Sequence, residues 1–165
     1  MKITAIRGIM LRCTCSPISD ALSTSTARQA LLVKIETDAG LYGIGEAFTY
    51  GAPLKIMKYL VEEQLGPMLI GQNPAEIEKH WNTMYWRTIA HGRRSMTMGA
   101  ISGIDIALWD LLGKAAHMPV CKLLGQHLDR VPSYASGGFY APGKDLHKLE
   151  DELEHYKAQG YRDMK

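Results

Sequence analysis

Residues 131–165 carry the pattern that most constrains the fold, because strand and helix signals alternate there. The segment VPSYASGGFY reads as a strand that ends in glycines, and KDLHKLEDELEHYKAQG has leucines at helical spacing with Gly160 as a stop signal. YRDMK then begins another strand. A strand, a helix and a strand in this order form a unit whose two strands run parallel. One such unit cannot close a sheet, so we expect it to open a larger α/β domain.

The preceding part of the chain shows strand patterns first and helix patterns afterwards. Alternating apolar residues predict strands over residues 2–12, 31–36 and 41–48, with residues 38–40 as the turn between the second and the third. These strands predict a small antiparallel sheet. Strands followed by helices are typical of an α+β domain.

Three helices are predicted after the third strand. Pro53 is placed at the first position of one helix, and Asn73 is expected to cap a second, with Pro74 at its first position and Glu76 close to a capping box. The third begins at Ser102 and is apolar around most of its surface. A helix of that kind is buried on two sides, so we expect a second body to cover it.

Residues 16–28 (SPISDALSTSTAR) are rich in serine and threonine and show no periodicity. We therefore predict a long loop between the first two strands. Loops of this length inside compact domains are often lids or binding loops.

Composition and charge narrow the class of protein. Of the 165 residues, 46% are hydrophobic and 22% are charged, which is ordinary for a soluble globular protein. The formal net charge of +2 is spread along the chain without a basic block, so no nucleic-acid partner is expected. No apolar run approaches the roughly 20 residues of a membrane helix, so no membrane association is expected either.

Three cysteines are too few for a disulfide scaffold, and a cytoplasmic location is expected from them. Cys13 and Cys15 would point to one face of a strand, but no second Cys or His pair stands at metal-ligand spacing. We therefore predict buried free thiols and no metal site in this chain. A redox or zinc protein built on these two cysteines and a histidine is a weaker alternative.

Four stretches together resemble the enolase superfamily, in the branch of mandelate racemase and muconate lactonizing enzyme. They are GLYGIGEA (40–47), LGPMLIGQNP (65–74), SGIDIALWDLLGKAAHMPVCKLLG (102–125) and VPSYASGG (131–138). The resemblance covers nearly the whole chain in order, and the helix from Ser102 with the following PVCKLLG is its most specific part. It implies an α+β capping domain at residues 1–130, followed by the first strand, helix and strand of a modified TIM (β/α) barrel at residues 131–165.

The resemblance also implies an activity for the full-length protein. Members of this branch use Mg²⁺ to abstract the α-proton of a small-molecule carboxylate substrate, which gives a metal-stabilised enediolate, and the outcome is racemisation, epimerisation, cycloisomerisation or dehydration of sugar acids. The Mg²⁺ ligands would lie beyond residue 165, so the chain by itself is expected to be inactive. A homo-oligomer is also implied. The alternative is a non-catalytic binding or assembly domain that shares the cap fold.

Lys165 is the candidate catalytic residue. In this family the second barrel strand often ends in Lys-x-Lys, and Lys165 fits the first of these lysines. Residues two apart on a strand share a face, and the like charge and the desolvation of such a pair lower a lysine pKa toward neutrality, where it can act as a general base. By resemblance the second lysine takes the proton, while Lys165 tunes it and contacts the substrate carboxylate. Members with a different base stay open, because position 167 lies beyond the chain.

Candidate substrate-binding residues come from three segments. By resemblance, the loop after the first strand, here Ser16 to Thr26, folds over the barrel mouth, and its candidates are Ile18, Leu22 and Thr24. Tyr50 stands where related racemases place an aromatic contact to substrate, although a surface or packing role is equally open. Ser136 ends the first barrel strand, on the side where barrel active sites lie. Its alternative is a serine of the turn before the following glycines.

Three carboxylates of the capping domain are expected to be structural. Asp105 and Asp110 are five apart on a helix and do not share a face, so we expect them to bond nearby backbone or to pair with a base. Glu46 in GIGE is also expected to be structural.

Overall fold

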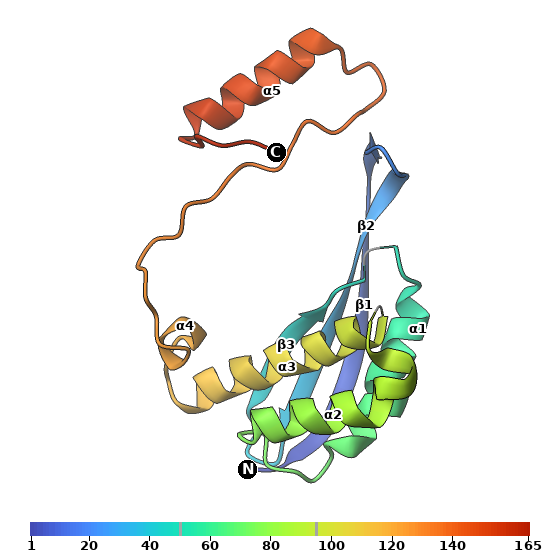
Figure 1. The fold of residues 1–165 in the computed structure, drawn as a ribbon, viewed down its shortest axis with the longest axis vertical. Helices are drawn as coiled ribbons and strands as arrows, with labels where there is room; N and C mark the ends of the chain where they lie inside the picture. The colour runs from blue at the N-terminus through green and yellow to red at the C-terminus, as the bar shows by residue number, and fades with distance from the viewer. Residues whose placement is uncertain (50, 95) are drawn as a thin grey trace. The chain divides into compact units, whose positions relative to one another are not determined.

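The computed structural model describes residues 1–49, 51–94 and 96–165, and the chain forms two compact units (Figure 1). Unit 1 comprises Met1–Arg12 and Gln29–Gln126, and unit 2 comprises Cys13–Arg28 and His127–Lys165. Residues 13–28 thus group with the carboxyl-terminal segment although they follow the first strand in sequence. The predicted domain boundary between residues 130 and 131 stays a prediction.

A three-stranded antiparallel sheet forms as predicted, with the order β1 (Ile3–Ser19), β2 (Thr24–Thr37) and β3 (Tyr42–Ala47). In the β2–β3 hairpin, Leu31 lies opposite Ala47 and Glu36 lies opposite Tyr42. The alternating side chains of β2 that were expected to face a core, such as Val33 and Ile35, are fully buried. Burial of one face fixes this register, because a slip by one residue would expose the whole apolar set.

The predicted loop over residues 16–28 is wrong. β1 continues to Ser19 and β2 begins at Thr24, so only a tight turn separates them. The Asp20 carboxylate closes that turn, because its Oδ1 accepts the amides of Leu22 and Ser23, each at 2.8 Å. All side chains from residue 13 to residue 28 are exposed or half-buried, so neither strand had to alternate between apolar and polar residues.

Two helices of unit 1 begin later than the sequence signals suggested, whereas the helix predicted from Ser102 begins earlier, at Met96. The helices of unit 1 are α1 (Leu54–Tyr59), the π-helical η1 (Leu60–Leu65), the 3-10 turn η2 (Gly66–Met68), α2 (Ile77–Gly92), α3 (Met96–Ala115) and α4 (Val120–Leu123). Pro53 is the residue before α1 and not its first residue. Asn73 does not cap α2, because its Oδ1 accepts the amide of Ala75 at 3.1 Å and closes a separate turn. The ring of His80 bonds the backbone oxygen of Asn73 at 2.7 Å and holds this turn against the helix.

Helix α3 is the central element of unit 1. It contacts β3 as well as α2, α1 and η1, which confirms the prediction that it is covered on two sides (Figure 1). Its apolar stripe, including Ile101, Ile104 and Leu108, is fully buried, whereas Ile106 is exposed. The cover comes from the layers of unit 1 itself and requires no second body. Within the described residues, α3 is the one helix long and apolar enough to span a membrane, but 56% of its most apolar 18-residue stretch is buried in the fold, as in a core helix.

Glycines allow β3 to lie directly against α3. A methyl group on Gly43 would collide with the backbone oxygen of Ala107, and one on Gly45 would lie 2.7 Å from the backbone nitrogen of Ala107. Both contacts are with backbone atoms, which cannot turn aside as a side chain can. The GxGE motif therefore has a packing role in this fold.

Each edge strand of the sheet has an amide bonded by a helix carboxylate. On β1 the amide of Gly8 donates to Oε1 of Glu62 at 2.8 Å, and on β3 the amide of Ile44 donates to Oδ2 of Asp110 at 2.7 Å. Each carboxylate also pairs with a lysine one helical turn away. Side chains that occupy edge donors in this way discourage pairing with another strand.

Unit 2 contains the strand–helix–strand pattern, with α5 (Leu146–Ala158) at its centre. Asp145 caps the helix by accepting the amide of Lys148 at 3.0 Å, and Gly160 follows it with a φ of 92°. The segments on either side run parallel, because Ala135 and Met164 form a parallel bridge. The prediction of parallel strands is thus confirmed, but the pairing is a short ladder around Ala135 and not a strand over residues 131–140.

Candidate functional site

Ser136 and Lys165 face each other across the parallel ladder of unit 2. Lys165 donates its amide to the oxygen of Ala135 at 2.9 Å and accepts the amide of Gly137 at 2.9 Å. This pattern places Lys165 opposite Ser136, and residues paired in this way project their side chains to the same face. The structure therefore brings these two predicted site residues together.

The face of Ser136 and Lys165 turns away from α5. Ala135, in the alternate position, is buried, and a methyl group on Gly137 would lie 2.6 Å from a ring carbon of Tyr156 in the helix. Tyr134 shares the face of Ser136, and the Nζ atom of Lys165 lies 5.9 Å from the centre of its ring. An ammonium group on a face that also carries two hydroxyl-bearing side chains is suited to bind a carboxylate.

Ile18, Leu22 and Thr24 lie at the end of the β1–β2 hairpin. Ile18 is half-buried, whereas Leu22 at the turn is 86% exposed. Thr24 is exposed, and its hydroxyl lies 2.7 Å from that of Ser19 across the neck of the hairpin. The three side chains are thus carried by paired strands and a closed turn, which define their positions more sharply than a long loop would.

The hairpin end is joined to the segment before α5 by a backbone bridge. Ser19 donates its amide to the oxygen of Tyr140 at 2.8 Å, and Tyr140 donates its own to the oxygen of Ser19 at 2.9 Å. In Figure 1 the free end of the hairpin lies beside this segment. Through this bridge the hairpin candidates and the pair Ser136–Lys165 belong to one compact unit. Tyr50 lies outside the described residues.

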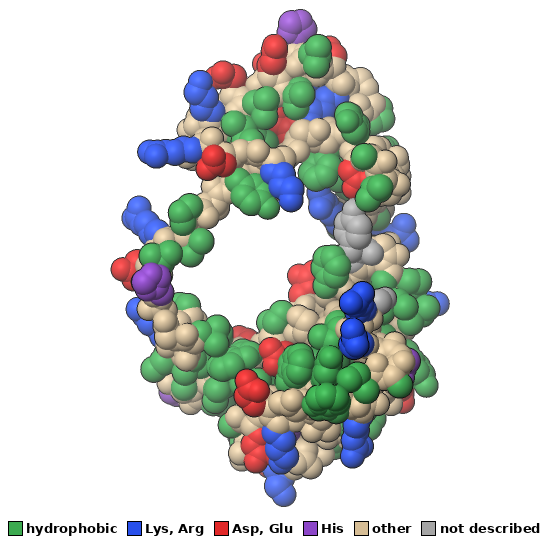
Figure 2. Space-filling model, viewed as in Figure 1, with side chains coloured by type: hydrophobic (Ala, Val, Ile, Leu, Met, Phe, Trp, Pro, Cys, Tyr) green, Lys and Arg blue, Asp and Glu red, His purple; other side chains and the backbone are tan. Residues whose placement is uncertain are grey.

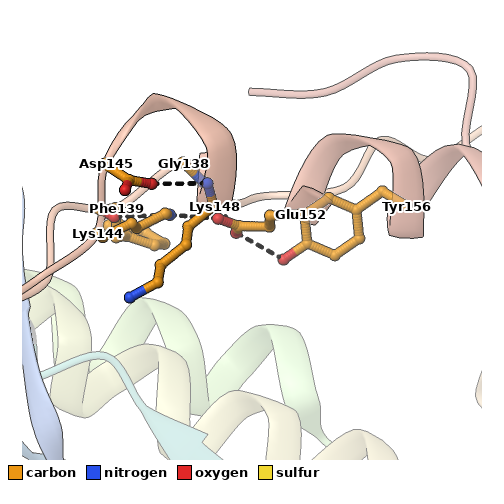
Figure 3. A network of polar contacts seen from close by, with 7 residues as sticks. All are labelled: Gly138, Phe139, Lys144, Asp145, Lys148, Glu152 and Tyr156. Carbon is orange, nitrogen blue, oxygen red and sulfur yellow. Dashed lines mark hydrogen bonds and ion pairs between the residues drawn. The ribbon is translucent and has the colours of Figure 1, made fainter. Parts of the chain in front are cut away.

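A carboxylate-centred network holds the segment before α5 (Figure 3). Glu152 accepts the amide of Gly138 at 3.1 Å and the hydroxyl of Tyr156 at 3.1 Å through Oε1, and it accepts the ammonium of Lys144 through Oε2. Lys144 also donates to the oxygen of Phe139 at 2.8 Å. The hydrogen bond from Lys144 keeps the pKa of Glu152 below its usual value. The hydrogen bond to Glu152 raises the pKa of Tyr156.

The sequence did not point to this network. Lys144 and Glu152 are eight residues apart, and one of them precedes the helix, so no helical or strand spacing relates them. The sequence does contain two glycines in this segment, Gly138 and Gly143. In the structure both have a positive φ, where the chain turns sharply. Glycines of this kind indicate a compact loop, but they do not indicate that Glu152 of α5 binds it.

The carboxylates of unit 1 have structural surroundings. Asp110 bonds the backbone of β3 and the ammonium of Lys114, which confirms the expected role. Burial, and secondarily the charge of Glu78, raises the pKa of Asp105. Glu46 is exposed on β3.

No metal centre is found in the part of the chain that the structure describes, where no group of three His, Cys, Asp or Glu side chains could hold an ion. The cysteines are free, but the expectation that they are buried is wrong. Cys13 and Cys121 are exposed and Cys15 is half-buried. Cys13 and Cys15 lie on the arm of the hairpin, where both faces are open, so their alternation on the strand does not imply burial. On the face drawn in Figure 2, basic and acidic side chains are interspersed over the surface.

Comparison with known proteins gives a consistent result. The family model described as mandelate racemase / muconate lactonizing enzyme, N-terminal domain, matches residues 4–125. An arabinonate dehydratase of Saccharolobus solfataricus is 39% identical over 83% of this chain and 36% of its own length. A D-mannonate dehydratase of Novosphingobium aromaticivorans is 37% identical over 98% of this chain and 36% of its own length. The chain therefore spans about a third of the length of these curated relatives.

Solved structures show the same likeness. An enolase superfamily member from Polaromonas sp. JS666 superimposes with a TM-score of 0.88 at 36% identity, over 99% of this chain and 43% of its own. A racemase from Streptomyces coelicolor A3(2) with bound magnesium gives 0.89 at 30% identity, over 98% and 45%. The 3,6-anhydro-D-galactonate cycloisomerase from Zobellia galactanivorans gives 0.76 at 32% identity, over 99% and 42%. The similar proteins thus include dehydratases, racemases and cycloisomerases.

Proposed function

The chain belongs to the mandelate racemase and muconate lactonizing enzyme family of the enolase superfamily, and from this premise we propose that it forms the amino-terminal part of a Mg²⁺-dependent enzyme acting on a sugar acid. The enzyme would remove the proton α to the substrate carboxylate. Dehydration is the outcome we favour, because curated relatives that match most of this chain are named arabinonate and D-mannonate dehydratases. Racemisation and cycloisomerisation are the competing outcomes, since structures of similar fold carry those names.

The pairing of Ser136 with Lys165 is the observation that carries this proposal. Both side chains stand on the face of the ladder that turns away from α5, and in a (β/α) barrel the face away from the helices is the interior. There the ammonium of Lys165 and the hydroxyl of Ser136 would bind the substrate carboxylate. Holding the carboxylate orients the adjacent C–H bond toward the base, which we place elsewhere in the barrel.

The residues of this chain contribute binding and orientation, and the described ones do not fit a metal site. From the family likeness we propose that the Mg²⁺ ligands lie outside residues 1–165. Ile18, Leu22 and Thr24 would contact the part of the sugar acid distant from the carboxylate, and Tyr50 would add a contact. We also propose that the protein is cytoplasmic, since its three cysteines are free. That it is a homo-oligomer is proposed from the family likeness.

The test uses the protein at its natural length, with arabinonate, mannonate and galactonate as substrates. Dehydration predicts a 2-keto-3-deoxy acid product that forms with Mg²⁺ and disappears when the metal is chelated. Lys165→Met should lower kcat/KM by about 10²-fold or more, because a group that contacts the reacting carboxylate is lost. Turnover that survives both chelation and Lys165→Met would contradict the proposal.

The position of deuterium after reaction in D2O separates the possible outcomes. Deuterium at the α-carbon of the recovered sugar acid, without loss of water, indicates a racemase or epimerase. Deuterium at C3 of a 2-keto-3-deoxy acid indicates a dehydratase, because loss of water turns the α-carbon into the keto carbon and solvent hydrogen enters at the next carbon. Binding of a sugar acid without exchange or turnover would favour the non-catalytic alternative.

A further inference from the structure

We infer that Lys144 and Glu152 are positioning residues for the hairpin end, which they hold through the bridge between Ser19 and Tyr140. The consequence for substrate selection rests on the proposed function, whereas the positioning itself does not. Lys144 and Glu152 bond each other and the residues Gly138, Phe139 and Tyr156, none of which is proposed to bind substrate. They act on the segment of residues 138–144, which we call the anchor loop.

Glu152 fixes the anchor loop at its beginning and at its end. Its Oε1 accepts the amide of Gly138, and its Oε2 accepts the ammonium of Lys144. Lys144 in turn donates to the oxygen of Phe139 at 2.8 Å (Figure 3). The side chains of Lys144 and Glu152 are only 18% and 24% exposed, so water competes weakly for these bonds. The anchor loop is therefore tied to α5 by a charged pair.

Tyr140 lies within the anchor loop and passes this restraint to the hairpin. Its backbone makes both hydrogen bonds of the bridge with Ser19. Ser19 is the last residue of β1, next to the turn, and its hydroxyl meets that of Thr24 on the other arm. A shift of the anchor loop would therefore move the hairpin neck and with it the side chains on either side.

The hairpin end lacks a core of its own, so its order depends on the bridge between Ser19 and Tyr140. In Cys13–Arg28 the structure shows no buried side chain, and Leu22 is 86% exposed. An isolated two-stranded hairpin is marginally stable at best in water. The bridge to Tyr140 supplies the ordering that burial supplies in unit 1.

Hydrogen exchange on the protein at its natural length tests the inference without any substrate. The amides of Ser19 and Tyr140 are both donors in the bridge, so their exchange reports whether it is closed. In Lys144→Met and Glu152→Gln we expect these amides to exchange about tenfold faster or more, while the amides of α3 stay unchanged. Lys144→Arg keeps the charge and should preserve most of the protection.

Glu154→Gln is the matched control. Glu154 is on the same helix and pairs with Lys157 at 3.9 Å, but its side chain is 75% exposed, so its loss should leave the bridge amides unchanged. Equal exchange in Lys144→Met, Glu152→Gln and wild type would overturn the inference. Tyr140→Pro, which removes one donor of the bridge directly, should speed exchange at Ser19 even where the charged variants fold poorly.

Kinetics give the second reading. Loss of hairpin positioning should raise KM for the preferred sugar acid about tenfold and change kcat less than threefold, because the carboxylate contacts of Ser136 and Lys165 are retained. Faster bridge exchange in a protein that turns over no sugar acid would support the positioning role and count against the proposed function. A rise in KM with unchanged bridge exchange would overturn the positioning role.

Discussion

Units 1 and 2 are stabilised by different interactions. Every fully buried large apolar side chain among the described residues belongs to unit 1, where the sheet packs on α3 and the shorter helices. Unit 2 contributes only Ala135 to the buried apolar residues, and its segments are joined by the network of Glu152 and the bridge to Ser19. Figure 2 shows hydrophobic side chains exposed over the part that contains α5; Val131 and Leu146 are each 76% exposed.

Because of this difference, the residues that stabilise the fold and the residues of the candidate site lie in different units. All five described site candidates lie in unit 2, whereas the residues that determine the sheet and α3 lie in unit 1. A change in unit 1 should therefore act on the free energy of unfolding, and a change in unit 2 should act on the positions of site residues. The three tryptophans, Trp81, Trp86 and Trp109, all belong to unit 1, so their fluorescence follows the unfolding of that unit alone.

The largest effect is expected from Leu108→Ala in α3. Leu108 is fully buried, and removing its side chain leaves a cavity that should lower the free energy of unfolding of unit 1 by roughly 2–5 kcal/mol. Urea unfolding followed by tryptophan fluorescence measures this. Leu146→Ala in α5 is the matched variant, and its exposed side chain should change the same quantity by less than about 0.5 kcal/mol. Equal effects would contradict the contrast between the units.

The next effect tests how closely β3 approaches α3. Gly45→Ala forces a methyl group against the backbone of Ala107, and overpacking of this kind should cost about 1–3 kcal/mol. Gly40→Ala is the control, because nothing lies within 4 Å of the added methyl group and only its φ of 76° is unfavourable. Its cost should be about 1 kcal/mol. A larger loss in Gly40→Ala than in Gly45→Ala would mean that backbone strain outweighs close packing here.

Much of unit 1 could be predicted because a strand or helix with one buried face has apolar residues at regular spacing in the sequence. Val33 and Ile35 alternate with polar residues, and the structure buries them as that alternation requires. The same logic explains the failure at residues 16–28, where both faces of the strands are open and no period is imposed. Asp20, which closes the turn, could not be recognised as a turn residue from the sequence, because the residues on either side of it do not alternate between apolar and polar.

The candidate site could be predicted only where strand spacing determines which side chains share a face. Ser136 and Lys165 were each proposed separately, and the ladder places them on one side because both stand in register on parallel segments. Lys144 and Glu152 could not be found in this way, since a loop of irregular backbone brings them together. The predicted start of α2 was wrong because Asn73 and Pro74 fit a turn as well as the beginning of a helix.

The charged pair of unit 2 should give it a specific dependence on pH. The pKa of Glu152 is lowered in the folded protein, so its contribution to stability is fully present above the unfolded pKa of about 4.3 and is lost as the pH falls through the folded pKa. Glu152→Gln should lower the stability of unit 2 at pH 7 by about 1–2 kcal/mol, and the difference from wild type should vanish in acid. Exchange of the α5 amides measures this. A difference that persists unchanged at low pH would show that the charge is not the cause.

The smallest effect has the opposite sign and belongs to unit 1. The pKa of Asp105 is raised by burial and by Glu78, so stability falls as the pH rises above the unfolded pKa of about 3.9. Asp105→Asn removes that charge and should stabilise unit 1 at pH 7 by a few tenths of a kcal/mol, since solvent screens a half-buried group. Glu78→Gln removes only the charge of Glu78 and should give a smaller gain in stability in the same direction.

Tryptophan fluorescence in urea at pH 4 and pH 7 measures the stability of both variants, and their gain over wild type should shrink at the lower pH. If Asp105→Asn instead loses stability at pH 7, then the carboxylate makes a bond in unit 1 that outweighs its burial, and the opposite pH slopes of the two units would not hold.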